Sequence, residues 1–165
     1  MVNFILLNGC DKASFVDQPH QAQQYIAEAK KLRIQKKWVE SNKKLFLAKQ
    51  ILSRNHEISE LIARNYMELD QYEAAIQTWR EYAEYGGSNA QNYIQKCEYY
   101  LKASQAYADA VSKNDLHDFK QVAVQYPDTP IVAKCYLAMA KWVLKKQNNK
   151  NEAVRYLNII ILNFK

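Results

Sequence analysis

The chain has 165 residues, the length of one domain, and only three glycines and three prolines, a composition that favours helix over sheet. Its hydrophobic share of 48% argues against a disordered chain, and no run reaches the roughly 18 apolar residues that a membrane-spanning helix needs. The net charge of +6 divides into a basic block over 28–54, an acidic block over 57–128 and a second basic block over 129–165, unlike the single basic stripe typical of a nucleic-acid binder.

Residues 1–17 form a separate N-terminal segment whose apolar run, Val2 to Leu7, is short. The run ends in Leu7-Asn8-Gly9-Cys10, which resembles the lipobox of bacterial lipoproteins. The resemblance implies cleavage before Cys10, lipid on that cysteine, and an Asp11 similar to the signal that retains lipoproteins at the inner membrane. No Lys or Arg precedes the run, in contrast to a normal secretory signal. Two hypotheses therefore stay open: a membrane-anchored protein of the bacterial envelope that faces the periplasm, and a cytoplasmic protein.

Four helices are predicted over the first half of residues 18–165, because apolar residues recur at spacings of three and four. Pro19 marks the start of the first helix, and the second carries Trp38 and Leu45. Asn55 is expected to cap the third, and Asp70 with Glu73 has the capping-box pattern for the fourth. Gly86-Gly87 is expected to end the fourth, since glycine tolerates the left-handed conformation at a helix C-terminus.

Four more helices are predicted over the second half. Ser88 with Gln91 opens the fifth, which is expected to be long and to reach Ser112. The sixth begins at Asn114 or Asp115 and ends at Tyr126-Pro127. Thr129-Pro130 starts the seventh, and the polar loop Gln147 to Lys150 separates it from the eighth. Eight helices with short joins predict successive antiparallel hairpins.

Residues 34 positions apart share their size class in the first two hairpins. The pairs are Ala29 with Ala63, Leu32 with Tyr66, Trp38 with Tyr72, Ser41 with Ala75, Leu45 with Trp79 and Ala48 with Tyr82. Small residues recur where helices approach closely, so we expect Ala63 and Ala75 to face each other within one hairpin. A further step of 34 reaches Cys97 and Tyr100, after which the register drifts because the fifth helix is lengthened.

The second unit carries a family resemblance. Its Ala63-x-x-Tyr66, Asp70-Gln-Tyr72-Glu and Ala75-x-x-x-Trp79 resemble the tetratricopeptide repeat. Phe119 to Pro130 resembles the unit ends of bacterial envelope tetratricopeptide proteins, among them the outer-membrane assembly lipoproteins, and residues 153–164 repeat that frame with Lys165 in place of proline. The resemblance covers residues 22–165 and implies an all-α, right-handed solenoid of about four hairpin units over a repeat domain at 18–165.

No catalytic pattern is found in the sequence. His20, His56 and His117 lie far apart, and none belongs to a HExxH motif. There is no glycine-rich phosphate loop, no GxSxG and no cysteine–histidine cluster with metal spacing. We therefore predict no enzyme activity, no cofactor and no metal. Cys97 and Cys135 fall among apolar residues and are expected to be buried free thiols.

The family resemblance also implies a binding groove lined by the first helix of each hairpin. The positions that it places there are Lys30, Arg33, Glu60, Arg64, Met67 and Glu98. Relatives that bind chaperones clamp a C-terminal carboxylate with Lys, Asn and Arg; the matching positions here hold Ile26, Lys30, Leu61, Gln91 and Gln95. Only one of these is basic, so that clamp is not supported. We expect the groove to bind an extended or helical segment of another protein through mixed charge and apolar contacts.

The last predicted helix has more apolar residues than one face accommodates. Ile159 to Leu162 are four consecutive large apolar residues and must point around more than half the helix. We expect the surface that includes Ile159, Ile161 and Leu162 to be covered by something outside this sequence: a second copy, a partner or further repeats.

Three function classes follow from the sequence. The preferred one is a non-catalytic protein–protein interaction scaffold, in its envelope form a membrane-anchored lipoprotein that aids assembly of a protein complex. The second is a binder of nucleic acid or anionic membrane through the basic segment 30–54, although the alternating charge blocks argue against nucleic acid. The third is a small α-helical enzyme.

Overall fold

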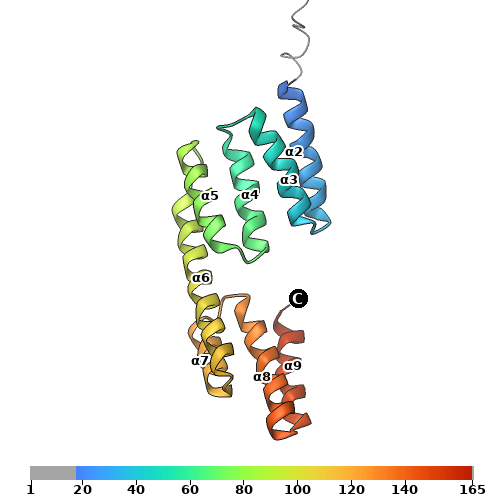
Figure 1. Ribbon diagram of the computed structural model, residues 1–165, viewed down its shortest axis with the longest axis vertical. Helices are drawn as coiled ribbons and strands as arrows, with labels where there is room; N and C mark the ends of the chain where they lie inside the picture. The colour runs from blue at the N-terminus through green and yellow to red at the C-terminus, as the bar shows by residue number, and fades with distance from the viewer. Residues whose placement is uncertain (1–17, 165) are drawn as a thin grey trace, which may run out of the picture. The chain divides into compact units, whose positions relative to one another are not determined.

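The computed structural model describes residues 18–164, and within that range it is all-helical, without a strand. The helices, labelled as in Figure 1, are α2 (Gln18–Ile34), α3 (Trp38–Ile51), α4 (His56–Glu68), α5 (Tyr72–Glu84), α6 (Ala90–Lys113), α7 (Leu116–Gln125), α8 (Ile131–Gln147) and α9 (Lys150–Asn163). The predicted all-α class is confirmed. None of these helices combines the length and the apolar character needed to cross a membrane. Cys10 and the lipobox pattern lie outside the described residues.

The chain divides into two compact units, and the boundary lies between Ile94 and Gln95, inside α6. Unit 1 contains α2 to α5 and the first residues of α6, with α2 on α3, α3 on α4 and α4 on α5 (Figure 1). Unit 2 contains the rest of α6 with α7, α8 and α9, where α7 packs on α8 and α8 on α9. The expectation of one repeat domain over 18–165 stays a prediction.

The core of unit 1 follows the apolar stripes of its helices. Ala22, Ile26 and Ala29 of α2 form one buried cluster with Leu45 and Ala48 of α3 and with Ile58 and Ile62 of α4. Beyond this cluster, Ala63, Ala75, Tyr72 and Trp79 are also buried completely or almost completely. Burial of this kind stabilises each large apolar side chain, such as Leu45 or Ile58, by about 1.5–3 kcal/mol, so packing rather than helix propensity holds the hairpins together.

Unit 2 has its own core. Ala103 and Ala110 of α6 meet Phe119, Val122 and Ala123 of α7 and Ile131, Val132, Cys135 and Met139 of α8. Tyr156 and Phe164 pack against the edge of this cluster. Cys97 and Cys135 are both buried and form no disulfide within the part of the chain that the structure describes, as the sequence predicted. Burial raises the pKa of the Cys135 thiol from 9.0 to about 11, which suits a packing role rather than a reactive one.

A left-handed residue at a helix end recurs at a spacing of 34 residues within each unit. Lys36 and Asp70 both adopt a left-handed backbone with φ of 57°, directly after α2 and α4. In both turns the next amide donates to a carbonyl one turn back, from Lys37 to Leu32 at 3.0 Å and from Gln71 to Tyr66 at 2.9 Å. These are Schellman turns, which satisfy the last carbonyls of a helix.

Unit 2 repeats the spacing with Asn114 and Asn148. Both have φ of 51°, at the ends of α6 and α8. The spacing from Asp70 to Asn114 is 44 residues, which is the period of 34 plus ten. The extra length falls where α6 runs for 24 residues, and this long helix explains why the sequence register drifts after Tyr100.

A third Schellman turn ends α5 at the predicted glycines. Gly86 has φ of 91°, and its amide donates to Ala83 O at 3.1 Å, while Gly87 donates to Tyr82 O at 2.8 Å. A Cβ atom at Gly87 would overlap the Tyr82 ring, so the second glycine allows the backbone to pass the aromatic side chain. The prediction that Gly86-Gly87 stops this helix is confirmed.

The capping-box prediction for α5 is wrong. Asp70 belongs to the left-handed turn that ends α4, and Gln71 precedes the first residue of α5 without a side-chain cap. Instead, the Asp70 carboxylate accepts a hydrogen bond from the Tyr72 hydroxyl at 2.8 Å. By contrast, Asn55 caps α4 as predicted, since its Oδ1 accepts from the amide of Ile58 at 3.1 Å.

Candidate functional site

Five of the six predicted groove residues lie on two helices of unit 1. Lys30 and Arg33 come from α2, and Glu60, Arg64 and Met67 from α4. Lys30 and Arg33 of α2 both contact α4. We call the surface that carries these five residues the α2–α4 face. Glu98, the sixth residue, is exposed on the part of α6 that belongs to unit 2. It therefore belongs to a different unit from the other five.

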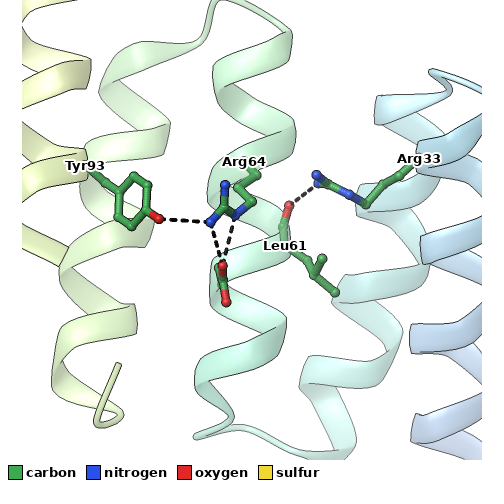
Figure 2. Close-up of polar contacts among 5 residues, drawn as sticks. Arg33, Leu61, Arg64 and Tyr93 are labelled. Carbon is green, nitrogen blue, oxygen red and sulfur yellow. Dashed lines mark hydrogen bonds and ion pairs between the residues drawn. The ribbon is translucent and has the colours of Figure 1, made fainter. Parts of the chain in front are cut away.

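Arg33 is half-buried and spans from α2 to α4. Its Nη1 donates to the carbonyl of Leu61 at 3.0 Å and to the side-chain oxygen of Asn65 (Figure 2 shows the Leu61 contact). The guanidinium carbon also lies 5.6 Å from the centre of the Trp38 ring. Burial, together with the positive charge of Arg64, lowers the pKa of Arg33. Arginine nevertheless stays charged at neutral pH, so this side chain is a fixed cation that links two hairpins.

Arg64 sits at the centre of a second set of contacts. Its Nε and Nη2 reach one carboxylate oxygen of Glu60 at 2.9 and 2.8 Å, and Nη2 donates to the Tyr93 hydroxyl at 3.0 Å (Figure 2). The rings of Tyr93 and Trp79 are stacked 4.2 Å apart, and the Arg64 guanidinium lies over both at 5.1 and 5.7 Å. Burial opposes the charge on Arg64, but the hydrogen bonds to Glu60 and Tyr93 outweigh it and raise the pKa. Arg64 thereby joins α4, α5 and the start of α6.

A buried polar network lies beneath Arg33, and the sequence reasoning missed it. Asn65 is completely buried, and its Nδ2 donates to Ser41 Oγ at 3.0 Å and to Asn42 Oδ1 at 2.7 Å. Ser41 in turn donates to the carbonyl of Ala29 at 3.1 Å. The network links α2, α3 and α4 and satisfies polar groups that would otherwise be costly to bury.

A signal for this network exists in the sequence. Ser41 and Asn42 are polar where Ala75 and Ile76 stand 34 residues later, and Asn65 is polar on the apolar side of α4. Three polar residues at core positions of one hairpin pair indicate a hydrogen-bonded cluster, because lone buried polar groups are rare.

The charges of the basic segment 30–54 are partly neutralised by acids. Lys30 pairs with Glu57 at 2.6 Å and Lys44 with Glu28 at 2.7 Å, and Lys49 pairs with Glu81. Together with Arg33, which is half-buried, four of the nine basic side chains are thus engaged within unit 1. This arrangement reduces the free positive charge that nucleic acid or anionic lipid would need.

The structure also places the predicted C-terminal interface residues. Ile161 and Leu162 are 67% and 75% exposed on α9, whereas Ile159 is half-buried. A pocket of about 420 Å³ lies beside them, lined by α8 and α9 through Ala133, Lys134, Leu137, Leu157, Ile160 and Ile161. Unit 2 therefore has an exposed apolar surface on α9. A molecule that covers this surface stays a prediction.

The three histidines lie on three different helices, each beside a side chain with which it interacts. His20, His56 and His117 lie on α2, α4 and α7, and each interacts with a neighbour: Gln24, Tyr82 and Gln121, respectively. Among residues 18–164 no group of three His, Cys, Asp or Glu side chains is placed to hold a metal ion. What the α2–α4 face offers is a set of charged and aromatic groups in fixed positions.

Comparison with known proteins adds no further constraint. No family model, no curated protein and no solved structure matches this chain. The resemblance to tetratricopeptide proteins therefore rests on the residues quoted above.

Proposed function

We propose that the chain is a non-catalytic scaffold of the tetratricopeptide type that binds a segment of another protein. The observation that carries the proposal is the left-handed residue at a helix end that recurs 34 residues apart, at Lys36 and Asp70 and again at Asn114 and Asn148. Helical units of this length stack into solenoids whose first helices line an extended binding surface. In unit 1 those helices are α2 and α4, the two that carry Arg33 and Arg64.

The α2–α4 face suits recognition of a peptide segment. Arg33 and Arg64 are held by protein contacts before any partner arrives, so little side-chain entropy is lost on binding. The Nη1 group of Arg64 makes no hydrogen bond with the described residues, which leaves donors for a partner carboxylate or carbonyl. Met67 lies three residues on, half-buried, and supplies an adaptable apolar contact.

Site-specific photocrosslinking in the source cell tests the proposal. A photoreactive amino acid at Met67 on α4 is expected to capture one or a few proteins reproducibly. The matched control carries the same group at Gln77, an exposed residue of α5. Capture at Met67 but not at Gln77 supports a partner on the α2–α4 face. Equal labelling from both positions, or none from either, would count against the scaffold proposal.

The envelope location is a separate part of the proposal. If Cys10 carries lipid, the protein is anchored to a membrane, and stable anchoring implies more than one acyl chain. Mass spectrometry of the native protein tests this directly. A lipid-modified Cys10 as the first residue is the expected result, and an intact Met1 with an unmodified Cys10 rules the anchor out.

A further inference from the structure

Unit 2 contains an open pocket of about 260 Å³ lined by residues of α6, α7 and α8, here called the α6–α8 pocket. Its walls include Tyr107, Val111, Phe119, Leu137 and Trp142. Small-molecule sites usually measure about 300–1,000 Å³, so this pocket fits one bulky side chain better than a whole ligand.

The walls of the pocket are held in place before any ligand binds. The Trp142 indole Nε1 donates to the carbonyl of Asn114 at 2.9 Å, and Asn114 is the left-handed residue that ends α6. Phe119 is buried in the core of unit 2, and its ring lies 6.1 Å from that of Tyr107. By contrast, Val111 and Leu137 are 48% and 41% exposed, so apolar surface remains open to a ligand.

Positive charge lies along the α8 side of this apolar surface. Lys141, Lys145 and Lys146 line the pocket, and no carboxylate does. None of the three lysines forms an ion pair with any residue in the range that the structure describes, whereas nearby Asp118 already pairs with Lys113. Leu137, Lys141 and Lys145 follow one another at four-residue spacing, which puts an apolar contact and two charges in one row along α8.

We propose that the α6–α8 pocket binds an acidic, amphipathic segment of a partner protein. One bulky apolar side chain of that segment enters the pocket, and aspartate or glutamate residues on either side of it pair with Lys141, Lys145 and Lys146. The inference rests on the proposed scaffold function and adds to it the chemistry of a partner. Leu137 also lines the apolar pocket between α8 and α9.

The experiment uses the full chain and short labelled peptides with blocked ends, so that no terminal carboxylate takes part. One peptide carries a central tryptophan and leucine flanked by glutamates. A second replaces the glutamates by lysines, and a third replaces the two apolar residues by serines. Fluorescence anisotropy is expected to show binding of the first peptide alone. Added salt is expected to weaken that binding, because exposed ion pairs are screened.

Two variants locate the site. The double variant Lys141→Glu, Lys145→Glu is expected to weaken binding of the acidic peptide by about tenfold or more, because two attractions become repulsions. The matched control is Lys120→Glu, Gln121→Glu on α7, two exposed positions outside the pocket, and it is expected to change binding little. In NMR spectra, the Trp142 indole signal is expected to shift with peptide while those of Trp38 and Trp79 do not.

The outcomes separate this proposal from the scaffold function. Binding that both variants weaken equally, or that shifts other indole signals, overturns the pocket assignment but leaves a protein-binding scaffold in place. Absence of binding by the acidic peptide overturns the proposed partner chemistry, while photocrosslinking from Met67 still decides the scaffold function. Vesicles of anionic phospholipid are the last arm. If the protein pellets with these vesicles but does not bind the peptide, and the double lysine variant no longer pellets, the lysines bind a membrane instead.

Discussion

The buried amide of Asn65 joins three helices of unit 1, and removing it tests how much that network stabilises. Asn65→Ala leaves Asn42 and Ser41 without their donor and Arg33 without one acceptor. The expected loss is about 1–3 kcal/mol in the free energy of unfolding, because buried polar groups then lack partners. Denaturant unfolding provides the measurement. The control Asn92→Ala, at an exposed position of α6, is expected to stay within about 0.5 kcal/mol, and an equal loss in both variants would contradict the assignment.

Ala75 tests the close approach of α4 and α5. Ala63 and Ala75 are both completely buried on these two packed helices, as expected if they face each other. Ala75→Leu adds volume that this contact cannot hold, so we expect a loss of about 1–3 kcal/mol. Ala83→Leu, an exposed alanine of the same helix, is the matched control in thermal unfolding. An unchanged midpoint for Ala75→Leu would show that the two alanines do not define the contact.

At the scale of the element, the hairpin turns contain a strain that substitution can relieve. Lys36 holds φ at 57°, a left-handed conformation that costs a residue with a side chain about 1–2 kcal/mol. Glycine adopts this conformation freely, although its unfolded state has more entropy, so Lys36→Gly is expected to stabilise unit 1 by about 0.5–1 kcal/mol. The neighbouring Lys37 has φ of −91°, and Lys37→Gly is expected to give no such gain. Denaturant unfolding measures the free energy of unfolding of both variants. A Lys36→Gly variant that is less stable than the unsubstituted chain would contradict the left-handed geometry at Lys36.

The helices themselves were predictable because they depend on local patterns. Apolar spacing, the Asn55 cap and the Gly86-Gly87 stop all act within a few residues, and the structure has each of them. The start of α5 was not predictable in the same way. Asp70 and Glu73 match a capping box in sequence, but the Schellman turn at the end of α4 takes Asp70 first. The capping box and the Schellman turn both require Asp70, and the amino-acid sequence alone does not show which of the two has the lower free energy.

For the whole molecule, the candidate sites were predictable only in part. The family resemblance placed Arg33 and Arg64 on one face, yet it gave no sign that Asn65, Tyr93 and Trp79 hold them there, since those contacts join residues 15 to 32 positions apart. The α6–α8 pocket was missed for a similar reason. Its residues come from three helices and a span of 40 positions, so no local sequence pattern brings them together.

The exposed surface of α9 leads to a prediction about assembly. Ile161 and Leu162 are largely exposed, and Ile161 lines the apolar pocket between α8 and α9. Exposed apolar patches of this kind usually mark a contact with another chain. We expect the purified chain to associate with a second copy through this surface as concentration rises, and Ile161→Glu to keep it monomeric. Because the Ile161 side chain makes few contacts within the chain, the substitution is expected to change the free energy of unfolding by less than about 0.5 kcal/mol.

Sedimentation velocity over a range of concentrations measures the association. The control is Val124→Glu, at a strongly exposed position of α7 outside this surface, which is expected to associate like the unsubstituted chain. A chain that stays monomeric at every concentration, or an Ile161→Glu variant that associates as before, would show that this surface does not bind a second copy.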